Sequence, residues 1–324
     1  MVAGAVFAER GKNFSLDWRG KEKLIKKRIC GIMPKLELTG HRKAYEGIGK
    51  GEKAMDSRPI GVFDSGVGGL TALRELRRIL PGEEFVYFGD TGRVPYGPKG
   101  RETILRYARQ DMAFLRSFDP KAIVIACGTV SANALGELTA ENDLPIFGVV
   151  GPAAQAAVRA TKNKKVGLIG TAASIRSGAY EKALAALDPA VTVTAKACPL
   201  FVPLVENGRF RPGDRVAELV VEEYLAPVKE AGVDTLVLGC THYPLLAQVI
   251  GRSMGEGVTL IDAGAVCADA AMKALGEKRL LSDRRQGSFR CFVSDTPQDF
   301  AALASIFLGE SVEGNVERVE IEKF

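Results

Sequence analysis

Two cysteine residues carry the strongest signal for chemistry in this chain. Cys127 lies in the segment ACGTVSAN and Cys240 in GCTHYP, and each follows a short apolar run. A lone cysteine after a strand is more often an inert small hydrophobic side chain than a reactive group. Here both thiols precede hydroxyl residues and the backbone N–H groups of a helix start, which lower a thiol pKa from its free value of about 8.5. We therefore expect both thiols to take part in proton transfer near neutral pH.

His242 follows Cys240 by two residues and is one of two histidines in the chain. An imidazole beside a thiol is a suitable partner for proton transfer, and a purely structural histidine is the alternative. Zinc needs about four nitrogen or sulfur ligands, and this neighbourhood supplies too few, so we expect no metal. No lysine lies in a setting that suggests a pyridoxal Schiff base, so we expect no cofactor.

The glycine-rich segment DSGVGG at 64–69 brings Asp64 to the end of an apolar run. Its backbone N–H groups at the start of the next helix favour a carboxylate or a phosphate. Gly66 and Gly68 match a dinucleotide fingerprint, with Thr71 in place of the last glycine and Asp90 as a candidate ribose-binding acid. The second half of the chain repeats the pattern of elements without these glycines, which argues against a dinucleotide.

A second loop, GDTGRVPYGPKG at 89–100, is rich in turn-forming residues. It is not a Walker loop, because Pro98 follows Gly97 where that motif requires a lysine. A structural turn is one interpretation of this loop. Its place after a predicted strand favours the other, a substrate-contact loop that carries Tyr96 and Gly97.

Parallel β–α units are the elements that must position these residues. Short apolar runs alternate with amphipathic stretches from residue 59 onward, which is the pattern of such units. The expected strands lie in PIGVFD, EEFVYFGD, KAIVIACG and PIFGVV, and then in KKVGLIGTAAS, VTVTAKACP, DTLVLGCTHYP and VTLIDAG. The two sets of four match each other, so Cys127 and Cys240 occupy equivalent positions at the carboxyl ends of equivalent strands. Ligands bind at that edge of an open α/β sheet.

The fold class expected is therefore α/β, with two pseudosymmetric domains, each a mainly parallel sheet flanked by helices, and a site in the cleft between them. We expect the first domain over 55–150 together with about 262–324, and the second over 151–261. The tail contains a helix-like run, ALASIFLGE, that would return to the first domain.

Residues 1–54 are expected to be a basic, poorly ordered extension. Residues 1–55 hold 13 Lys and Arg against 6 Asp and Glu, which leaves 31 against 33 in the rest. The body is thus nearly neutral, which argues against a nucleic-acid partner. Met55 precedes the first regular pattern, so an upstream start codon is a hypothesis for this extension.

The composition is that of a globular protein, with 46% hydrophobic and 26% charged residues among 324. No apolar run approaches 18 residues, so we expect no membrane span. The six cysteines contain no Cys-x-x-Cys pair, which predicts reduced thiols and a cytoplasmic protein. The remaining four, Cys30, Cys198, Cys267 and Cys291, lack a comparable setting and are expected to be structural.

Taken together, the segments IGVFDSGVGGLT, GDTGRVPYGPKG, ACGTVSA and LGCTHYPLL resemble the glutamate racemase family over about residues 58–310. The resemblance implies a cofactor-independent enzyme of cell-wall (peptidoglycan) synthesis that interconverts L-glutamate and D-glutamate, and a homodimer. One thiolate removes the α-proton and the other thiol returns a proton to the opposite face.

The resemblance also implies roles for individual residues. Cys127 would act on the D-glutamate face with Asp64, and Cys240 on the L-glutamate face with His242 and Glu206. The positions implied to hold the substrate are Asp64, Ser65, Tyr96, Gly97, Gly128, Thr129, Thr241 and His242. Gly128 departs from the asparagine most often found there, and its backbone N–H, Ser131 or Asn133 would have to compensate.

Two alternatives remain from the sequence. A related racemase acting on aspartate or another amino acid shares the paired thiols, although Cys-Thr-His here, rather than a glutamate after Cys-Thr, favours glutamate. A non-catalytic amino-acid-binding protein would use the same cleft without needing both thiols.

Overall fold

The computed structural model describes residues 56–312 and 314–324. The predictions made for residues 1–54, including the start-codon hypothesis, lie outside the described residues. All contacts discussed below lie within one compact unit, Ala54–Phe324.

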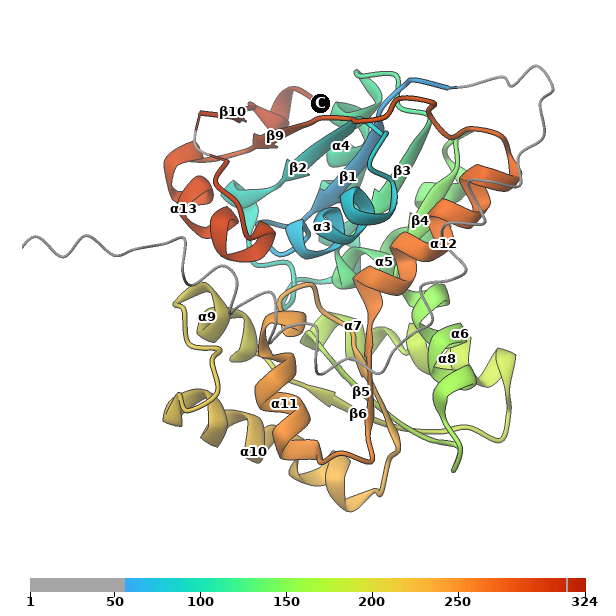
Figure 1. The fold of residues 1–324 in the computed structure, drawn as a ribbon, viewed down its shortest axis with the longest axis vertical. Coiled ribbons are helices and arrows are strands. Elements are labelled where there is room, and N and C mark those ends of the chain that lie inside the picture. The colour runs from blue at the N-terminus through green and yellow to red at the C-terminus, as the bar shows by residue number, and fades with distance from the viewer. Residues whose placement is uncertain (1–55, 313) are drawn as a thin grey trace, which may run out of the picture. The chain divides into compact units, whose positions relative to one another are not determined.

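Two parallel sheets form the framework of this unit (Figure 1). The first has the order β10-β9-β2-β1-β3-β4, and the second the order β6-β5-β7-β8. All strand pairings are parallel. The first sheet comprises β1 (Ile60–Asp64), β2 (Phe85–Gly89), β3 (Ala122–Ile125), β4 (Ile146–Gly148), β9 (Phe289–Val293) and β10 (Val316–Arg318). The second comprises β5 (Lys165–Gly170), β6 (Thr192–Ala197), β7 (Thr235–Leu238) and β8 (Thr259–Asp262).

The predicted equivalence of the two halves is confirmed by strand order. The order β2-β1-β3-β4 in the first sheet has the same form as β6-β5-β7-β8 in the second. All eight runs predicted as strands form strands, and the fold class is α/β as expected. The domain boundaries and the cleft stay predictions.

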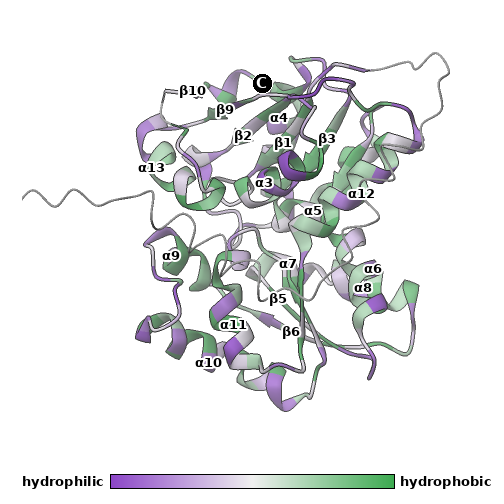
Figure 2. Ribbon diagram, in the orientation of Figure 1, coloured by the Kyte–Doolittle hydropathy of each residue, from purple (hydrophilic) through white to green (hydrophobic). Residues whose placement is uncertain are grey.

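Helices connect the strands, as parallel pairing requires. They are α3 (Leu70–Ile79), α4 (Arg101–Arg116), α5 (Gly128–Ala140), α6 (Val150–Ala160), α7 (Ala172–Ser177), α8 (Ala179–Leu187), α9 (Phe201–Glu206), α10 (Arg215–Glu230), α11 (Ala247–Met254), α12 (Ala263–Glu277) and α13 (Pro297–Leu308). Single 3₁₀ turns lie at η1 (Thr91–Arg93), η2 (Tyr243–Leu246) and η3 (Ile321–Lys323). In Figure 2, α10 and α11 carry both hydrophilic and hydrophobic patches, as expected for helices with one face packed inward.

The tail returns to the first sheet. Strand β9 pairs with β2, and β10 with β9, so the chain adds two strands that the sequence patterns did not predict. The helix expected in ALASIFLGE is confirmed as α13, which packs against α3.

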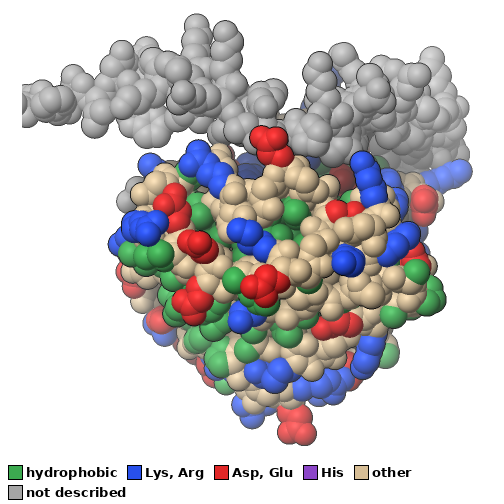
Figure 3. Space-filling view, turned by 90° about the horizontal axis from the view of Figure 1, so that it is seen from below, with side chains coloured by type: hydrophobic (Ala, Val, Ile, Leu, Met, Phe, Trp, Pro, Cys, Tyr) green, Lys and Arg blue, Asp and Glu red, His purple; other side chains and the backbone are tan. Residues whose placement is uncertain are grey.

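Charge and hydropathy of the described residues are those of a globular protein. On the face drawn in Figure 3, Lys and Arg side chains are interspersed with Asp and Glu rather than gathered in one patch. Among the described residues, no helix is both long and apolar enough to cross a membrane.

Candidate active site

Strand β1 ends at Asp64, whose side chain is buried. Its Oδ2 accepts a hydrogen bond from the Gly66 backbone N–H at 3.2 Å, which closes the tight turn. Its Oδ1 accepts one from the Thr241 hydroxyl at 3.2 Å. Because Thr241 follows a strand of the second sheet, Asp64 links the strand ends of the two sheets.

Glycine makes this approach possible. A Cβ built on Gly68 would lie 2.5 Å from the His242 ring and closer still to the Thr241 hydroxyl, whereas real Cβ atoms stay beyond about 3.0 Å. Thr71, at the start of α3, donates its hydroxyl to the Thr241 carbonyl at 2.9 Å. The first loop therefore lies directly on the segment that contains Cys240.

Cys127 directly precedes the first residue of α5, and its thiol has a polar partner. Its thiol donates to the Ser65 hydroxyl at an Sγ–Oγ distance of 3.7 Å, and Ser65 donates to Asp64 Oδ2 at 3.4 Å. The three groups form a chain of donors and acceptors that ends on a buried carboxyl group.

Cys240 has a corresponding chain in the second half. Its Sγ lies 3.9 Å from His242 Nδ1, and His242 Nε2 lies 2.9 Å from Glu206 Oε1 at the end of α9. The bond to Glu206 assigns the ring proton to Nε2, which leaves the Nδ1 lone pair directed at the thiol. Each thiol therefore contacts a polar side chain, which in turn contacts a carboxyl group. A narrow gap beside Cys240 is lined by Gly128 and Val149 of the first half and by Gly239 and Thr241 of the second.

The expectation that the helix start lowers the thiol pKa is wrong for this structure. Burial raises the pKa of Cys127 to about 12, with the nearby Asp64 charge adding to the rise. N–H groups of Val130 and Ser65 act in the lowering direction and do not compensate. Burial likewise raises the pKa of Cys240, and also that of the Asp64 carboxyl. Desolvation penalises any charged form, so it outweighs the partial charges at a helix terminus.

The buried thiols predict a loss of stability at alkaline pH. All five cysteines of the described residues are buried and free. Burial raises the pKa of Cys198, Cys267 and Cys291 to about 12 as well. A thiol whose pKa is raised by folding contributes stability that is complete below the unfolded pKa of about 8.5 and is lost as pH rises toward the folded value.

We therefore expect the free energy of unfolding to fall between pH 8 and pH 10, measured by urea denaturation with a reductant present. Each thiol should raise the unfolding equilibrium constant by up to about tenfold per pH unit above its unfolded pKa. The double variant Cys267→Ala/Cys291→Ala should show a shallower pH slope, whatever its stability at pH 7. An unchanged slope in that variant would contradict the prediction.

Residues 61–271 match the family model described as Asp/Glu/Hydantoin racemase. The chain belongs to the Asp/Glu/Hydantoin racemase family. Relatives place it among the glutamate racemases, so it is an amino-acid racemase, an isomerase.

Three glutamate racemases illustrate the similarity. The protein from Geobacter metallireducens is 47% identical over 269 residues, which cover 83% of this chain and 98% of that protein. The structure from Thermus thermophilus, in complex with β-chloro-D-alanine, is 47% identical with a TM-score of 0.75, and the match covers 83% of this chain and 100% of that one. The structure from Francisella tularensis, in complex with D-glutamate, is 36% identical with a TM-score of 0.77 and the same coverage.

In this racemase the residue after Cys127 has no space for a side chain. A Cβ on Gly128 would overlap the Gly239 carbonyl oxygen, which belongs to the backbone and cannot rotate away. The side chains expected to compensate are already in use. Ser131 donates to the Ile125 carbonyl at 3.0 Å, and the Asn133 amide donates to the Thr129 carbonyl at 2.8 Å. The Gly128 backbone N–H is therefore the remaining candidate to replace the missing asparagine side chain.

The structure places Thr129, Tyr96 and Gly97 in contacts of the fold. Thr129 Oγ1 lies 2.9 Å from Thr171 Oγ1, and the Gly97 carbonyl accepts from the Ala173 N–H at 2.9 Å. Both contacts join the first half of the chain to the segment that follows β5. The Tyr96 hydroxyl donates to the buried carboxyl groups of Asp90 and Asp111.

Tyr96 lies in a buried cluster of polar side chains that the sequence patterns did not predict. Its hydroxyl donates to Asp90 and, at 3.3 Å, to Asp111, and Arg93 bridges the same two carboxylates. A detectable signal was present, since Asp111 interrupts the apolar stripe of α4 between Ala108 and Leu115. A buried acid at a core position of a helix requires partners. No group of three or more His, Cys, Asp and Glu side chains suited to a metal is found in 56–312 and 314–324.

Proposed function

We propose that this racemase interconverts L-glutamate and D-glutamate by a cofactor-independent mechanism with two cysteine bases. The observation that carries the proposal is the pair of matched chains, Cys127–Ser65–Asp64 and Cys240–His242–Glu206, at equivalent strand ends. Further support comes from the relatives named glutamate racemase and from a similar structure in complex with D-glutamate.

The first step is removal of the α-proton by one thiolate. For D-glutamate this base is Cys127 and for L-glutamate it is Cys240. The C–H electron pair stays on the α-carbon as a carbanion, and the opposite thiol then donates its proton to the other face. The enzyme ends each turnover with the protonated and deprotonated cysteines exchanged, so a second turnover in the reverse sense restores the first state.

Because burial raises the pKa of both thiols, a neighbouring group must accept the thiol proton before the thiolate can act as a base. Asp64 and Glu206, through Ser65 and His242, are the groups placed to accept the thiol proton. The substrate's α-ammonium is attached to the reacting carbon and favours a thiolate beside it. Burial keeps water away from the carbanion, and fixed N–H groups of the loops stabilise the negative charge of the carboxylate next to it.

Backbone and hydroxyl groups at the strand ends bind the substrate. Ser65, Thr129, Thr241 and the N–H groups of Gly97 and Gly128 hold the carboxylates and the ammonium. Tyr96 contributes by holding its loop in place through Asp90 and Asp111. We also propose that the enzyme is cytoplasmic, works as a homodimer and supplies D-glutamate for peptidoglycan synthesis.

Proton NMR in deuterium oxide tests the proposed activity. Purified enzyme is given D-glutamate or L-glutamate with no cofactor, and with a chelator in a parallel sample. We expect loss of the α-proton signal and inversion from either enantiomer. The same experiment with aspartate separates the substrate assignments. Reaction of aspartate but not glutamate would overturn the substrate, and silence across a panel of amino acids would overturn the enzyme activity in favour of a binding protein.

A further inference from the structure

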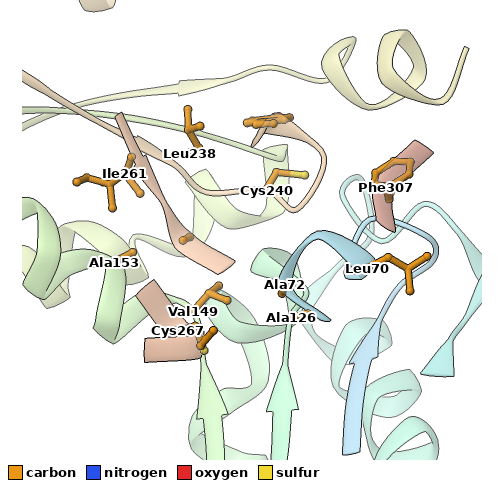
Figure 4. Close-up of a cluster of buried hydrophobic side chains, with 14 of the residues drawn as sticks. Leu70, Ala72, Ala126, Val149, Ala153, Leu238, Cys240, Ile261, Cys267 and Phe307 are labelled. Carbon is orange, nitrogen blue, oxygen red and sulfur yellow. The ribbon is translucent and has the colours of Figure 1, made fainter. Parts of the chain in front are cut away.

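Phe307, near the end of α13, contacts the imidazole of His242. The two ring centroids lie 5.2 Å apart with an interplanar angle of 84°, an edge-to-face arrangement. Phe307 is fully buried, and Figure 4 draws it in the same group of apolar side chains as Cys240. The two rings are 65 positions apart in the sequence, and the helix that carries Phe307 packs against α3 beside the first sheet.

The first half of the chain holds Phe307 in place. Arg74 on α3 donates from Nη1 to the Phe307 carbonyl at 3.1 Å. One turn later on the same helix, Arg77 pairs with Glu310, just past the end of α13. Helix α3 begins directly after the loop that carries Asp64, so the same element positions that loop and the aromatic ring over His242.

His242 needs this support because its polar contacts do not fix the ring alone. The Sγ–Nδ1 distance of 3.9 Å to Cys240 is long, so a modest rotation of the ring would break it. The Glu206 side chain is 38% exposed, against 7% for His242, so water competes for the bond that sets the tautomer. An apolar ring packed against the imidazole restricts rotation and excludes water from that side.

We propose that Phe307 is a positioning residue that keeps His242 Nδ1 directed at Cys240 and His242 Nε2 directed at Glu206. The inference rests on the proposed function only for the role of Cys240 as a base. It gives the tail a part in the chemistry, since a helix of the first half orients a proton-transfer group of the second.

The decisive variant is Phe307→Leu, which keeps an apolar side chain and removes the flat ring. The matched control is Phe300→Leu, because Phe300 is also buried on α13 and contacts Tyr87 rather than His242. Both variants lose a similar amount of packing, so we expect the unfolding temperature to fall by a similar amount in each. A difference between them in catalysis then reports on the contact with His242.

Two readouts are expected to separate the variants. Phe307→Leu should lower kcat by about tenfold and change the pH profile of kcat, whereas Phe300→Leu should leave the pH profile unchanged. Nitrogen-15 NMR of histidine-labelled full-length protein reports the tautomer directly, and His41→Gln identifies the His242 signals because the chain has two histidines. We expect one tautomer, protonated at Nε2, in wild type and in Phe300→Leu, and a mixture in Phe307→Leu.

The outcomes distinguish this inference from the proposed function. An unchanged tautomer and an unchanged pH profile in a folded Phe307→Leu protein would overturn the positioning role. Equal changes in both variants would also overturn it and would assign the effect to α13 packing in general. If the wild-type enzyme proves inactive on glutamate, the NMR comparison still tests whether Phe307 orients His242.

Discussion

Replacing either Cys127 or Cys240 by serine is expected to reduce glutamate racemisation by about a thousandfold or more in both directions. A serine hydroxyl is a far weaker acid than a thiol, and a positioned acid–base group contributes roughly a hundredfold to ten-thousandfold to rate. The two enantiomers have equal free energies, so kcat/KM must fall by the same factor in each direction. The measurement is circular dichroism of each enantiomer with time.

Deuterium exchange separates the roles of the two thiols, which the rates cannot. In deuterium oxide, Cys240→Ser keeps Cys127 and should exchange the α-proton of D-glutamate without inversion. Cys127→Ser should exchange that of L-glutamate instead. Exchange of the opposite enantiomer in each variant would contradict the assignment of faces.

A matched control is available in the buried cysteines outside the site. Cys291→Ala in β9 removes a buried thiol and should leave kcat and KM unchanged in folded protein. Binding of glutamate, measured by calorimetry, should survive in both serine variants. If racemisation survives in them as well, the two-base mechanism is wrong.

Gly68→Ala is the second substitution with a large expected effect. The added methyl group would lie 2.5 Å from the His242 ring and would overlap the Thr241 hydroxyl. The backbone of Gly68 is outside the left-handed region, so alanine meets a steric obstacle and no conformational one. We expect His242 and Thr241 to be displaced and kcat/KM to fall by about a hundredfold, because misplacement by about 1 Å has an effect of that order.

Gly136→Ala is the control for this substitution. Gly136 lies on α5, and an added Cβ would meet no atom within 4 Å beyond the adjoining helix backbone, so alanine should stabilise the helix by about 0.5–1 kcal/mol and leave activity unchanged. Measurement of kcat/KM and of the unfolding temperature for both variants separates a local effect at His242 from a general effect of removing glycine. Wild-type activity in Gly68→Ala would contradict this prediction. It would show that the loop containing Gly68 can move away from Thr241 and His242 without loss of function.

Most strands of the fold could be predicted because the sequence patterns that indicate them are local. Apolar runs that alternate with amphipathic stretches mark parallel β–α units, and every strand expected from them is present. The two strands of the C-terminal tail could not be predicted in this way. Strand β9 follows a polar stretch with turn residues, and β10 has three residues, so only pairing with β2 and β9 makes them strands.

By itself, the sequence predicted which residues could bear the chemistry. Cys127 and Cys240 were identified from their positions after matching strands, and the glycine-rich loop from residues that allow a tight turn. These predictions could be made without coordinates, because the chain direction and the repeat of strand order bring equivalent strand ends to equivalent edges.

Only the tertiary structure decided the pKa values of those residues and the contacts that position them. The thiol pKa is raised rather than lowered, because desolvation depends on everything packed over the sulfur, not on the adjacent helix start. The pairing of His242 with Glu206 and Phe307, and that of Tyr96 with Asp111, join residues far apart in the chain. Such contacts leave almost no local pattern, since they are set by how the sheets, helices and loops pack together.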